Sequence, residues 1–273
     1  MLGQDVSACL AAQHEVIPLA RSDADITDPG SVSGALERAR PDVVIHAAAY
    51  TAVDECELRP EHAFLVNSEG TRHVAQACAR LGAALVFVST DYVFSGESAS
   101  PYQENDVPGP INQYGRSKLA AEAYVRTLAE KFWIVRVSWL FGPKGRNFVK
   151  AIVAKTAHGE ALQVVDDQFG SPTYTWDAAE KIGEIITRAR HGIYHVTNHG
   201  YCSWFDFAKE IISQARCTGV AVNPIPASAT NRPAPRPRNS RLENIHLLRE
   251  GLGLLPNWQD ALHRYLMRDG ALL

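Results

Sequence analysis

The chain has 273 residues, of which 46% are hydrophobic and 21% charged, and its formal net charge is -3. A chain of this length can bury a sizeable core, in one large domain or in two small ones. The absence of any apolar run near the roughly 20 residues that cross a bilayer argues against a membrane protein, and the weak net charge argues against a nucleic-acid partner.

Five cysteines are spread along the sequence without a C-x-x-C pair. An odd number at such spacing favours neither a disulfide framework nor a zinc site. The first residues, MLGQDVSACLAAQ, have no basic stretch followed by an apolar one, so no signal peptide is predicted. We expect a cytoplasmic protein with reduced thiols.

Short apolar strands alternate with helical segments over roughly the first half of the chain. The predicted strands are HEVIPLA (14–20), DVVIHAAA (42–49), ALVFVST (84–90) and FWIVRVSW (132–139). Between them lie predicted helices at 29–40, which begins at Pro29, and at 68–82, which ends at Gly82. This order and these uniformly apolar strands predict an α/β fold, a Rossmann-like doubly wound parallel sheet covered by helices on both faces.

The rhythm loosens after residue 140, and five prolines fall between 224 and 237. That segment cannot form a regular helix or a central strand. Because helical sequence resumes at 242–253 and 258–268, we interpret it as an ordered excursion over a ligand, with a flexible linker as the alternative. We therefore expect a dinucleotide-binding domain at 1–139, to which a helix at about 174–190 returns, and a smaller, mainly substrate-binding α/β lobe at 140–273.

Tyr114 and Lys118 lie four residues apart in YGRSKLAAE, which places them on one face of a predicted helix. A phenol with a pKa near 10 is a poor acid-base catalyst at neutral pH unless a nearby cation stabilises its phenolate. A lysine one turn along the helix can supply that cation. The pair alone is weak, since two solvated helix residues give the same spacing.

Neighbouring strands strengthen the catalytic interpretation. One ends in Ser89, Thr90 and Asp91, and the strand before it ends in the small residues Ala47, Ala48 and Ala49. The carboxyl ends of parallel strands form the ligand crevice of such folds. A hydroxyl there can bind a substrate oxygen, and small side chains let a flat cofactor approach the backbone.

In this arrangement the sequence resembles the extended short-chain dehydrogenase/reductase family over essentially its whole length. The resemblance rests on ten segments in order, namely DITDP, PDVVIHAAAYTAVDECE, VNSEGT, STDYVFSG, NQYGRSKLAAE, RVSWLFG, NFV, DQFGSPT, GIYHVTN and RPAPRPRNSRL. Within that family it is similar to enzymes that reduce the C4 keto group of a dTDP-linked 4-keto-6-deoxy sugar, giving dTDP-L-rhamnose.

The resemblance implies catalytic roles for Thr90, Tyr114 and Lys118. Thr90 would orient the substrate carbonyl, and Tyr114 would donate a proton to its oxygen. Lys118 would lower the phenol pKa and hold the nicotinamide ribose, while Asn67 would support the site. Hydride would come from NADPH, with NADH as a second possibility, because the end of the second predicted strand offers Arg21 rather than an acid.

Further positions follow from the same matching. The cofactor would be bound by Met1, Leu2, Gly3, Arg21, Asp25, Ile26, Ala47, Ala48 and Ala49, together with Tyr114 and Lys118. The substrate would be bound by Thr90, Asp91, Trp139, Asn147, Arg236 and Arg241. Guanidinium groups suit the nucleotide diphosphate, although a solvated basic loop is the alternative for the two arginines.

Family members begin with a strand and a G-x-x-G-x-x-G turn that holds the pyrophosphate. The present sequence begins inside that turn and retains what resembles its last glycine, Gly3. We interpret this as an upstream start that was missed or cut away, or as an internal methionine at position 1, rather than as a non-catalytic binder. The intact Thr/Tyr/Lys set favours the first two explanations.

Two other functions stay open. An epimerase or dehydratase of the same fold is one, but dehydratases of the family follow the threonine with Asp-Glu, whereas Asp91 is followed here by Tyr92. A regulatory subunit similar to the beta subunit of methionine adenosyltransferase, which would bind NADP(H) without turnover, is the other. A homodimer is possible with either.

A metal site is not expected. His191, His195 and His199 recur every four residues, but GIYHVTN is typical of a strand, on which that spacing does not align them.

Overall fold

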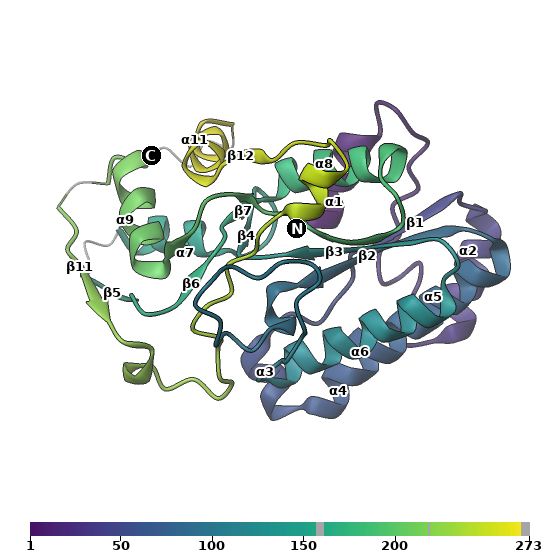
Figure 1. Ribbon diagram of the computed structural model, residues 1–273, viewed down its shortest axis with the longest axis horizontal. Helices are drawn as coiled ribbons and strands as arrows, with labels where there is room; N and C mark the ends of the chain where they lie inside the picture. Colours follow the sequence, from purple (N-terminus) through teal and green to yellow (C-terminus); the bar gives the residue numbers. More distant parts are fainter. Residues whose placement is uncertain (157–160, 218, 269–273) are drawn as a thin grey trace.

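The computed structural model describes residues 1–156, 161–217 and 219–268. Its centre is a parallel sheet of four strands in the order β1-β2-β3-β8, formed by β1 (Val43–His46), β2 (Ala84–Thr90), β3 (Phe132–Val137) and β8 (Gly192–His195) (Figure 1). Val43 lies opposite Ala84, Leu85 opposite Phe132, and Trp133 opposite Gly192. The predicted α/β class and three of the four predicted strands are confirmed, and GIYHVTN supplies the fourth strand of the sheet.

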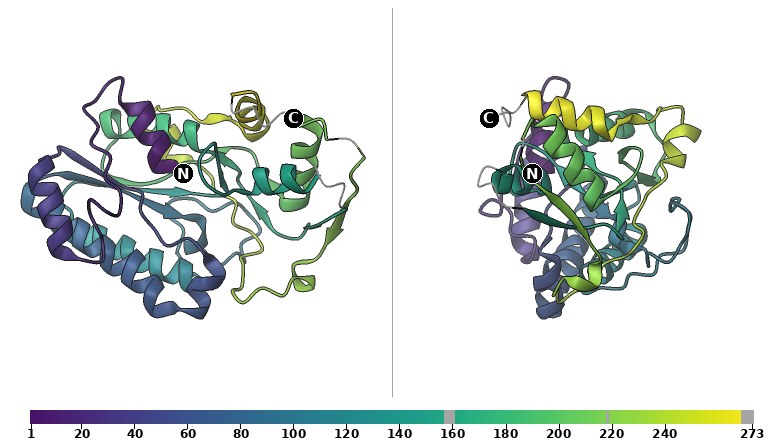
Figure 2. Two further views of the ribbon diagram at one scale, coloured as in Figure 1. Left: turned by 180° about the vertical axis from the view of Figure 1, so that it is seen from behind. Right: turned by 90° about the vertical axis from the view of Figure 1, so that its left-hand side faces the viewer.

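Helices cover both faces of this sheet, as Figures 1 and 2 show from opposite sides. On one face lie α2 (Pro29–Ala39), α5 (Gly70–Leu81) and α6 (Gln113–Leu128), whose apolar side chains share a cluster with Leu85 and Phe87 of β2. On the other face lie α1 (Leu2–Leu10), α8 (Thr175–Arg188) and α10 (Ile245–Arg249), which cluster with Val86. Successive residues of β2 thus face opposite layers, as a buried parallel strand requires.

Local capping explains where the main helices begin and end. Asp28 accepts a hydrogen bond from the Gly30 amide (2.9 Å) at the start of α2, which has Pro29 as its first residue. Gly82 closes α5 with a φ of 69° and donates its amide to the last carbonyls of the helix. Both boundaries agree with the sequence-based prediction.

The predicted strand at 14–20 is wrong. Residues 15–20 form no regular structure, and Ile17 and Leu19 are 50% and 43% exposed. No ladder hydrogen bond joins the outer edge of β1 to any residue that the structure describes. A strand forms only where a neighbour can pair with its backbone, and in the sequence as given no strand lies between residues 15–20 and β1.

Beyond the sheet, the second half of the chain builds a smaller α/β layer from short strand pairs. These are β4 (Leu140–Phe141) with β7 (Thr173–Tyr174), β5 (Leu162–Val165) with β11 (Val222–Ile225), β6 (Phe169–Gly170) with β10 (Cys202–Ser203), and β9 (Asn198–His199) with β12 (Leu255–Asn257). They share a core with α7 (Phe148–Thr156), α9 (Trp204–Gln214) and α11 (Trp258–Arg268). This core is separate from the two that flank the large sheet.

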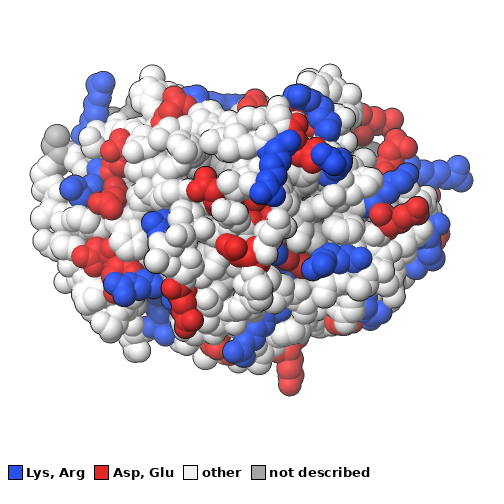
Figure 3. Space-filling model, viewed as in Figure 1, with Lys and Arg blue, Asp and Glu red and all other residues white. Residues whose placement is uncertain are grey.

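Short helical segments complete the fold near the carboxyl ends of the strands. They are α3 (Val53–Leu58), α4 (Pro60–Phe64), the π-helical turn η1 (Leu65–Glu69), and the 3-10 turns η2 (Asp91–Val93) and η3 (Ala227–Ala229). In the ranges described above, no helix is both long and apolar enough to cross a membrane. Positive and negative side chains are interspersed over the face shown in Figure 3.

Replacing Ile182 by Ala should lower the free energy of unfolding by about 2–5 kcal/mol, because Ile182 of α8 is fully buried beside α1 and the sheet. The same substitution at Ile17, which is 50% exposed, should change it by less than about 0.5 kcal/mol. Urea denaturation of the two variants measures both values. An equally large effect at Ile17 would contradict the open arrangement of residues 15–20.

Candidate active site

The carboxyl ends of β1 and β2 carry the small residues and the hydroxyl that the sequence singled out. Ala47, Ala48 and Ala49 follow β1 directly, and a Cβ placed on Gly3 would lie 3.6 Å from the Cβ of Ala47. The amino end of α1, with Met1 and Leu2, therefore lies beside the alanines. A helix amino terminus next to strand ends is where such folds bind phosphate groups.

Thr90 is the last residue of β2 and is buried. Its hydroxyl accepts a hydrogen bond from the Tyr92 amide (3.2 Å) and donates one to Asp91 Oδ1 (3.0 Å). Ser138, just beyond β3, donates to Asp91 Oδ2 (2.9 Å). Burial raises the pKa of Asp91 to about 6, against the opposing effect of the hydroxyl groups that donate to it.

Tyr114 and Lys118 lie in the first turns of α6, which begins where Asn112 accepts a hydrogen bond from the Gly115 amide (2.8 Å). The Lys118 ammonium donates to the Val88 carbonyl of β2 (2.8 Å) and lies 4.0 Å from the centre of the Phe87 ring. Lys118 is almost fully buried, and this burial lowers its pKa to about 7 although Glu122 acts in the opposite direction. The lysine is thus anchored against the strand that carries Thr90.

One electrostatic expectation is corrected. Lys118 was expected to lower the pKa of Tyr114, but burial raises that pKa, and the nearby Thr90 hydroxyl opposes the rise only in part. Apolar surroundings favour the neutral phenol as they favour the neutral amine. The phenol is therefore held in its protonated form, which is the form that can donate a proton.

Asn67 supports the start of α6 from the π-helical turn η1. Its side chain accepts a hydrogen bond from the Tyr50 amide (2.7 Å) and donates to the Tyr50 carbonyl (3.0 Å) and to Ser117 Oγ (3.0 Å). Ser117 in turn donates to the Tyr114 carbonyl (2.8 Å). All capacity of this buried amide on the site side is used to fix the backbone around Tyr114.

A buried ion pair behind the site was missed by the sequence reasoning. Arg136 of β3 donates to both carboxylate oxygens of Glu122 on α6, at 2.9 and 2.7 Å, and Ser89 donates to the same carboxylate (2.6 Å). Both charged side chains are nearly inaccessible. The available signal was Arg136 itself, since a charge inside an otherwise apolar strand needs a buried partner.

The residues expected near the adenosine end lie on the loop before α2. Arg21 is 79% exposed and pairs with Asp25 at 3.2 Å. Asp25 Oδ1 accepts from the amide and the hydroxyl of Thr27, and these hydrogen bonds lower the pKa of Asp25. The Ile26 carbonyl meets the His73 ring (2.9 Å). The Asp25 carboxylate is occupied, whereas the Arg21 guanidinium keeps most of its surface.

Two expected substrate residues have structural partners. Trp139 has a positive φ of 44° and stacks on Trp204 with ring centres 3.5 Å apart, so it is one layer of an aromatic stack rather than a separate wall. Asn147 caps α7 by accepting from the Lys150 amide (3.0 Å) and donates to the Gly142 carbonyl (2.8 Å). It also lies 4.0 Å from the sulfur of Met1, next to the amino end of α1.

The two arginines expected to meet a diphosphate are already paired. Arg241 donates to the Ala99 carbonyl (2.6 Å) and to Asn239 Oδ1 (2.8 Å). Arg236 forms an ion pair with Asp54 of α3, which no sequence feature had indicated. The interpretation of both as free cations is therefore wrong. In the basic cluster, Arg232 and Arg238 are the exposed members.

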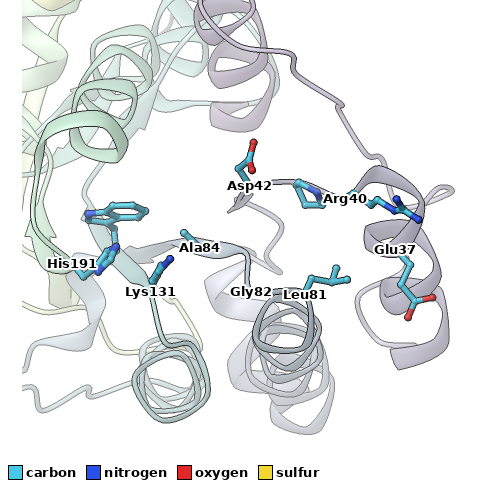
Figure 4. Close-up of a pocket in the computed structure, with 10 residues that line it drawn as sticks. Glu37, Arg40, Asp42, Leu81, Gly82, Ala84, Lys131 and His191 are labelled. Atoms are coloured by element: carbon cyan, nitrogen blue, oxygen red, sulfur yellow. The ribbon is translucent and has the colours of Figure 1, made fainter.

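A pocket of about 740 Å³ lies at the opposite end of the sheet (Figure 4). It is lined by residues that precede or begin β1, β2 and β3, including Asp42, Ala84 and Trp133. Thr90 and the alanines follow the other ends of the strands. Because ligands of such folds bind at the carboxyl ends, this pocket is separate from the candidate active site. In the described parts of the chain, no cluster of three His, Cys, Asp or Glu side chains is placed to hold a metal ion.

Comparison with known proteins agrees with this geometry. The model of the RmlD substrate binding domain matches residues 1–270. The chain belongs to this family. It is 40% identical to a dTDP-4-dehydrorhamnose reductase of Streptomyces griseus, over 96% of the chain and 88% of the relative. It is 38% identical to a dTDP-4-keto-6-deoxy-D-glucose reductase of Streptomyces niveus, over 96% and 92%.

Solved structures give the same result for this RmlD-family chain. A dTDP-4-dehydrorhamnose reductase of Bacillus anthracis in complex with NADP is 40% identical, with a TM-score of 0.95 over 98% of the chain and 95% of that structure. A UDP-glucose 4-epimerase of Thermus thermophilus with NAD has a TM-score of 0.83 at 20% identity, over 100% of the chain and 97% of that structure, and shows the shared Rossmann-like fold alone.

The buried Lys118 predicts a specific dependence of stability on pH. Its pKa falls from 10.5 to about 7 on folding, so between those values the unfolded chain binds more protons and the free energy of unfolding rises with pH. The stability of wild type relative to Lys118→Met should therefore increase between pH 7 and 10, by at most about 1 kcal/mol per pH unit. Urea denaturation at several pH values measures it.

The matched control is Lys131→Met, which removes an exposed lysine. If the difference between wild type and Lys118→Met did not change with pH, or changed as it does for the control, burial of the Lys118 ammonium would be refuted.

Proposed function

We propose that this chain reduces the C4 keto group of dTDP-4-dehydro-L-rhamnose to dTDP-L-rhamnose with NADPH. The observation that carries the proposal is the placement of Thr90, Tyr114 and Lys118 where β2 ends and α6 begins. Relatives at 38–40% identity that act on such dTDP sugars support the substrate class. NADP in the Bacillus anthracis reductase supports the cofactor, with NADH as a weaker second donor.

Each catalytic side chain then has one task. The Thr90 hydroxyl is fixed by the Tyr92 amide and Asp91, so it is held in position to orient the substrate carbonyl. Tyr114, kept protonated by its apolar surroundings, donates the proton to the carbonyl oxygen. The Lys118 ammonium, anchored on the Val88 carbonyl, stabilises the phenolate that this transfer leaves.

The residues at the strand ends fit a dinucleotide in chemical terms. Gly3 brings the amino end of α1 next to Ala47 without a side chain between them, which suits a pyrophosphate. Ala48 and Ala49 continue the small surface, while Arg21, Asp25 and Ile26 lie on the loop that would meet the adenosine. When bound, the reduced nicotinamide supplies the hydride that carbonyl reduction requires. In this proposal residues 1–139 and α8 hold the cofactor, and residues 140–273 mainly hold the sugar nucleotide.

On the substrate side, Asp91, Trp139 and Asn147 lie next to Thr90, across the aromatic stack, and beside Met1. Arg236 lies near Tyr92, whose ring packs edge-on against the Tyr114 ring with centres 5.9 Å apart. Arg241 is the more distant of the two arginines in this proposal, because its guanidinium is bonded to Ala99 and Asn239.

The alternatives are less well supported. The epimerase relative shares 20% identity, half that of the reductases, and Tyr92 stands where a dehydratase would need a second carboxylate. A regulatory subunit would bind NADP(H) without reducing the sugar. The cytoplasm is the compartment of this proposal, since all five cysteines are free thiols, and a homodimer is its assembly.

Replacing Tyr114 by Phe should lower kcat for the keto sugar by at least about 100-fold, because it removes the proton donor. Binding of NADPH should be retained, since the ring remains. Steady-state kinetics and a fluorescence titration measure the two quantities. Tyr124→Phe on the same helix is the control and should leave kcat within about twofold; near-parental turnover by Tyr114→Phe would refute the assignment.

Replacing Arg21 by Ala should raise the Kd of NADPH about tenfold and leave that of NADH within about twofold, because an exposed guanidinium can bind the additional phosphate. Fluorescence titration with each nucleotide measures the change. Arg38→Ala, on the exposed surface of α2, is the control. An equal loss for both nucleotides would show that Arg21 does not read the phosphate.

A further inference from the structure

A segment of the proline-rich region, residues 233–238, is fixed across the candidate active site, and we refer to it as the strap. Arg236 donates from its two terminal nitrogens to the two carboxylate oxygens of Asp54, at 2.5 and 2.7 Å. The Ala234 amide donates to the same carboxylate (3.2 Å). Figure 1 shows this part of the chain passing beside α3. Asp54 thus holds the strap through both a side chain and the backbone.

A second attachment joins the strap to the catalytic helix. Asn112, which caps α6 two residues before Tyr114, donates its side-chain amide to the Pro235 carbonyl (2.9 Å). Glu57 of α3 accepts from the Gln113 amide (2.9 Å), so α3 and α6 are also joined directly. The strap, α3 and the start of α6 therefore form one bonded unit next to Tyr114.

The guanidinium of Arg236 is held without being used up. Its bonds to Asp54 and to the Ala234 carbonyl (2.7 Å) use three of its five N–H groups. It also hydrogen-bonds the Tyr92 side chain, whose ring packs against the Tyr114 ring. The Arg236 side chain is 9% exposed, whereas that of Asp54 is 38% exposed. The arginine is on the inner side of the pair, toward the site.

We propose that Asp54 is a positioning residue for the substrate diphosphate: it fixes Arg236 so that the remaining N–H groups meet the phosphate oxygens. This inference rests on the proposed function, because it needs a substrate with a diphosphate. A bidentate pair holds the planar guanidinium in one orientation, so less side-chain entropy is lost on binding. The carboxylate also repels a phosphate, and the inference requires positioning to outweigh that repulsion.

The test replaces Asp54 by Asn, which keeps the size and removes the charge. Calorimetric titration with dTDP and with thymidine separates an effect on the diphosphate from an effect on the nucleoside. We expect the Kd of dTDP to rise at least tenfold and that of thymidine to stay within twofold. In turnover, KM for the keto sugar should rise while kcat stays within about twofold. Glu55→Gln, a neighbouring exposed acid of α3, is the control and should change neither.

A double variant shows whether Asp54 acts through Arg236. In an Arg236→Gln background, Asp54→Asn should weaken dTDP binding by less than twofold, because no guanidinium is left to position. The inference is overturned if Asp54→Asn binds dTDP as tightly as the parent or more tightly. It is also overturned if dTDP and thymidine weaken equally, which indicates a loosened strap. A parent chain that binds no dTDP would overturn the proposed substrate class as well.

Discussion

The buried ion pair between Glu122 and Arg136 is the interaction on which the geometry of the site depends. It joins the middle of α6 to β3, and Ser89 of β2 donates to the same carboxylate. Removing one member of such a pair would leave an uncompensated charge in the core, so the helix has one stable position on the sheet. Because α6 is a single helix of 16 residues, fixing its middle also fixes Tyr114 and Lys118 in its first turns, relative to Thr90 on the neighbouring strand.

The site is apolar in character as well as precise in position. Burial lowers the pKa of Lys118 and raises those of Tyr114 and Asp91, so each group is shifted toward its neutral form. His46, at the end of β1, follows the same rule, and burial lowers its pKa to about 3. An environment of this kind strengthens any charge interaction formed inside it. A protonated phenol and a lysine that responds to nearby negative charge are what carbonyl reduction requires of this chain.

Elements that depend on neighbouring residues in the sequence were predictable. The helix at 29–39 follows from Asp28 and Pro29, and the strands at 84–90 and 132–137 follow from uninterrupted apolar runs between helices. The segment at 14–20 has similar local composition but forms no strand, because a strand also needs a partner for its backbone. Likewise, Arg236 looked like a free cation, and its partner Asp54 is 182 residues away. Nothing in the spacing of either residue indicates that they meet.

The sequence by itself determined the alternation of strands and helices, the family, and the identity of the Thr/Tyr/Lys set, since each rests on local pattern or on the order of short motifs. The tertiary structure alone decided which charges are paired, which pKa values rise or fall, and that the largest pocket lies at the far end of the sheet from the strand ends that carry Thr90 and the alanines. The physical reason is that desolvation and ion pairing depend on what packs against a group. Those neighbours come from distant parts of the chain, which only folding brings together.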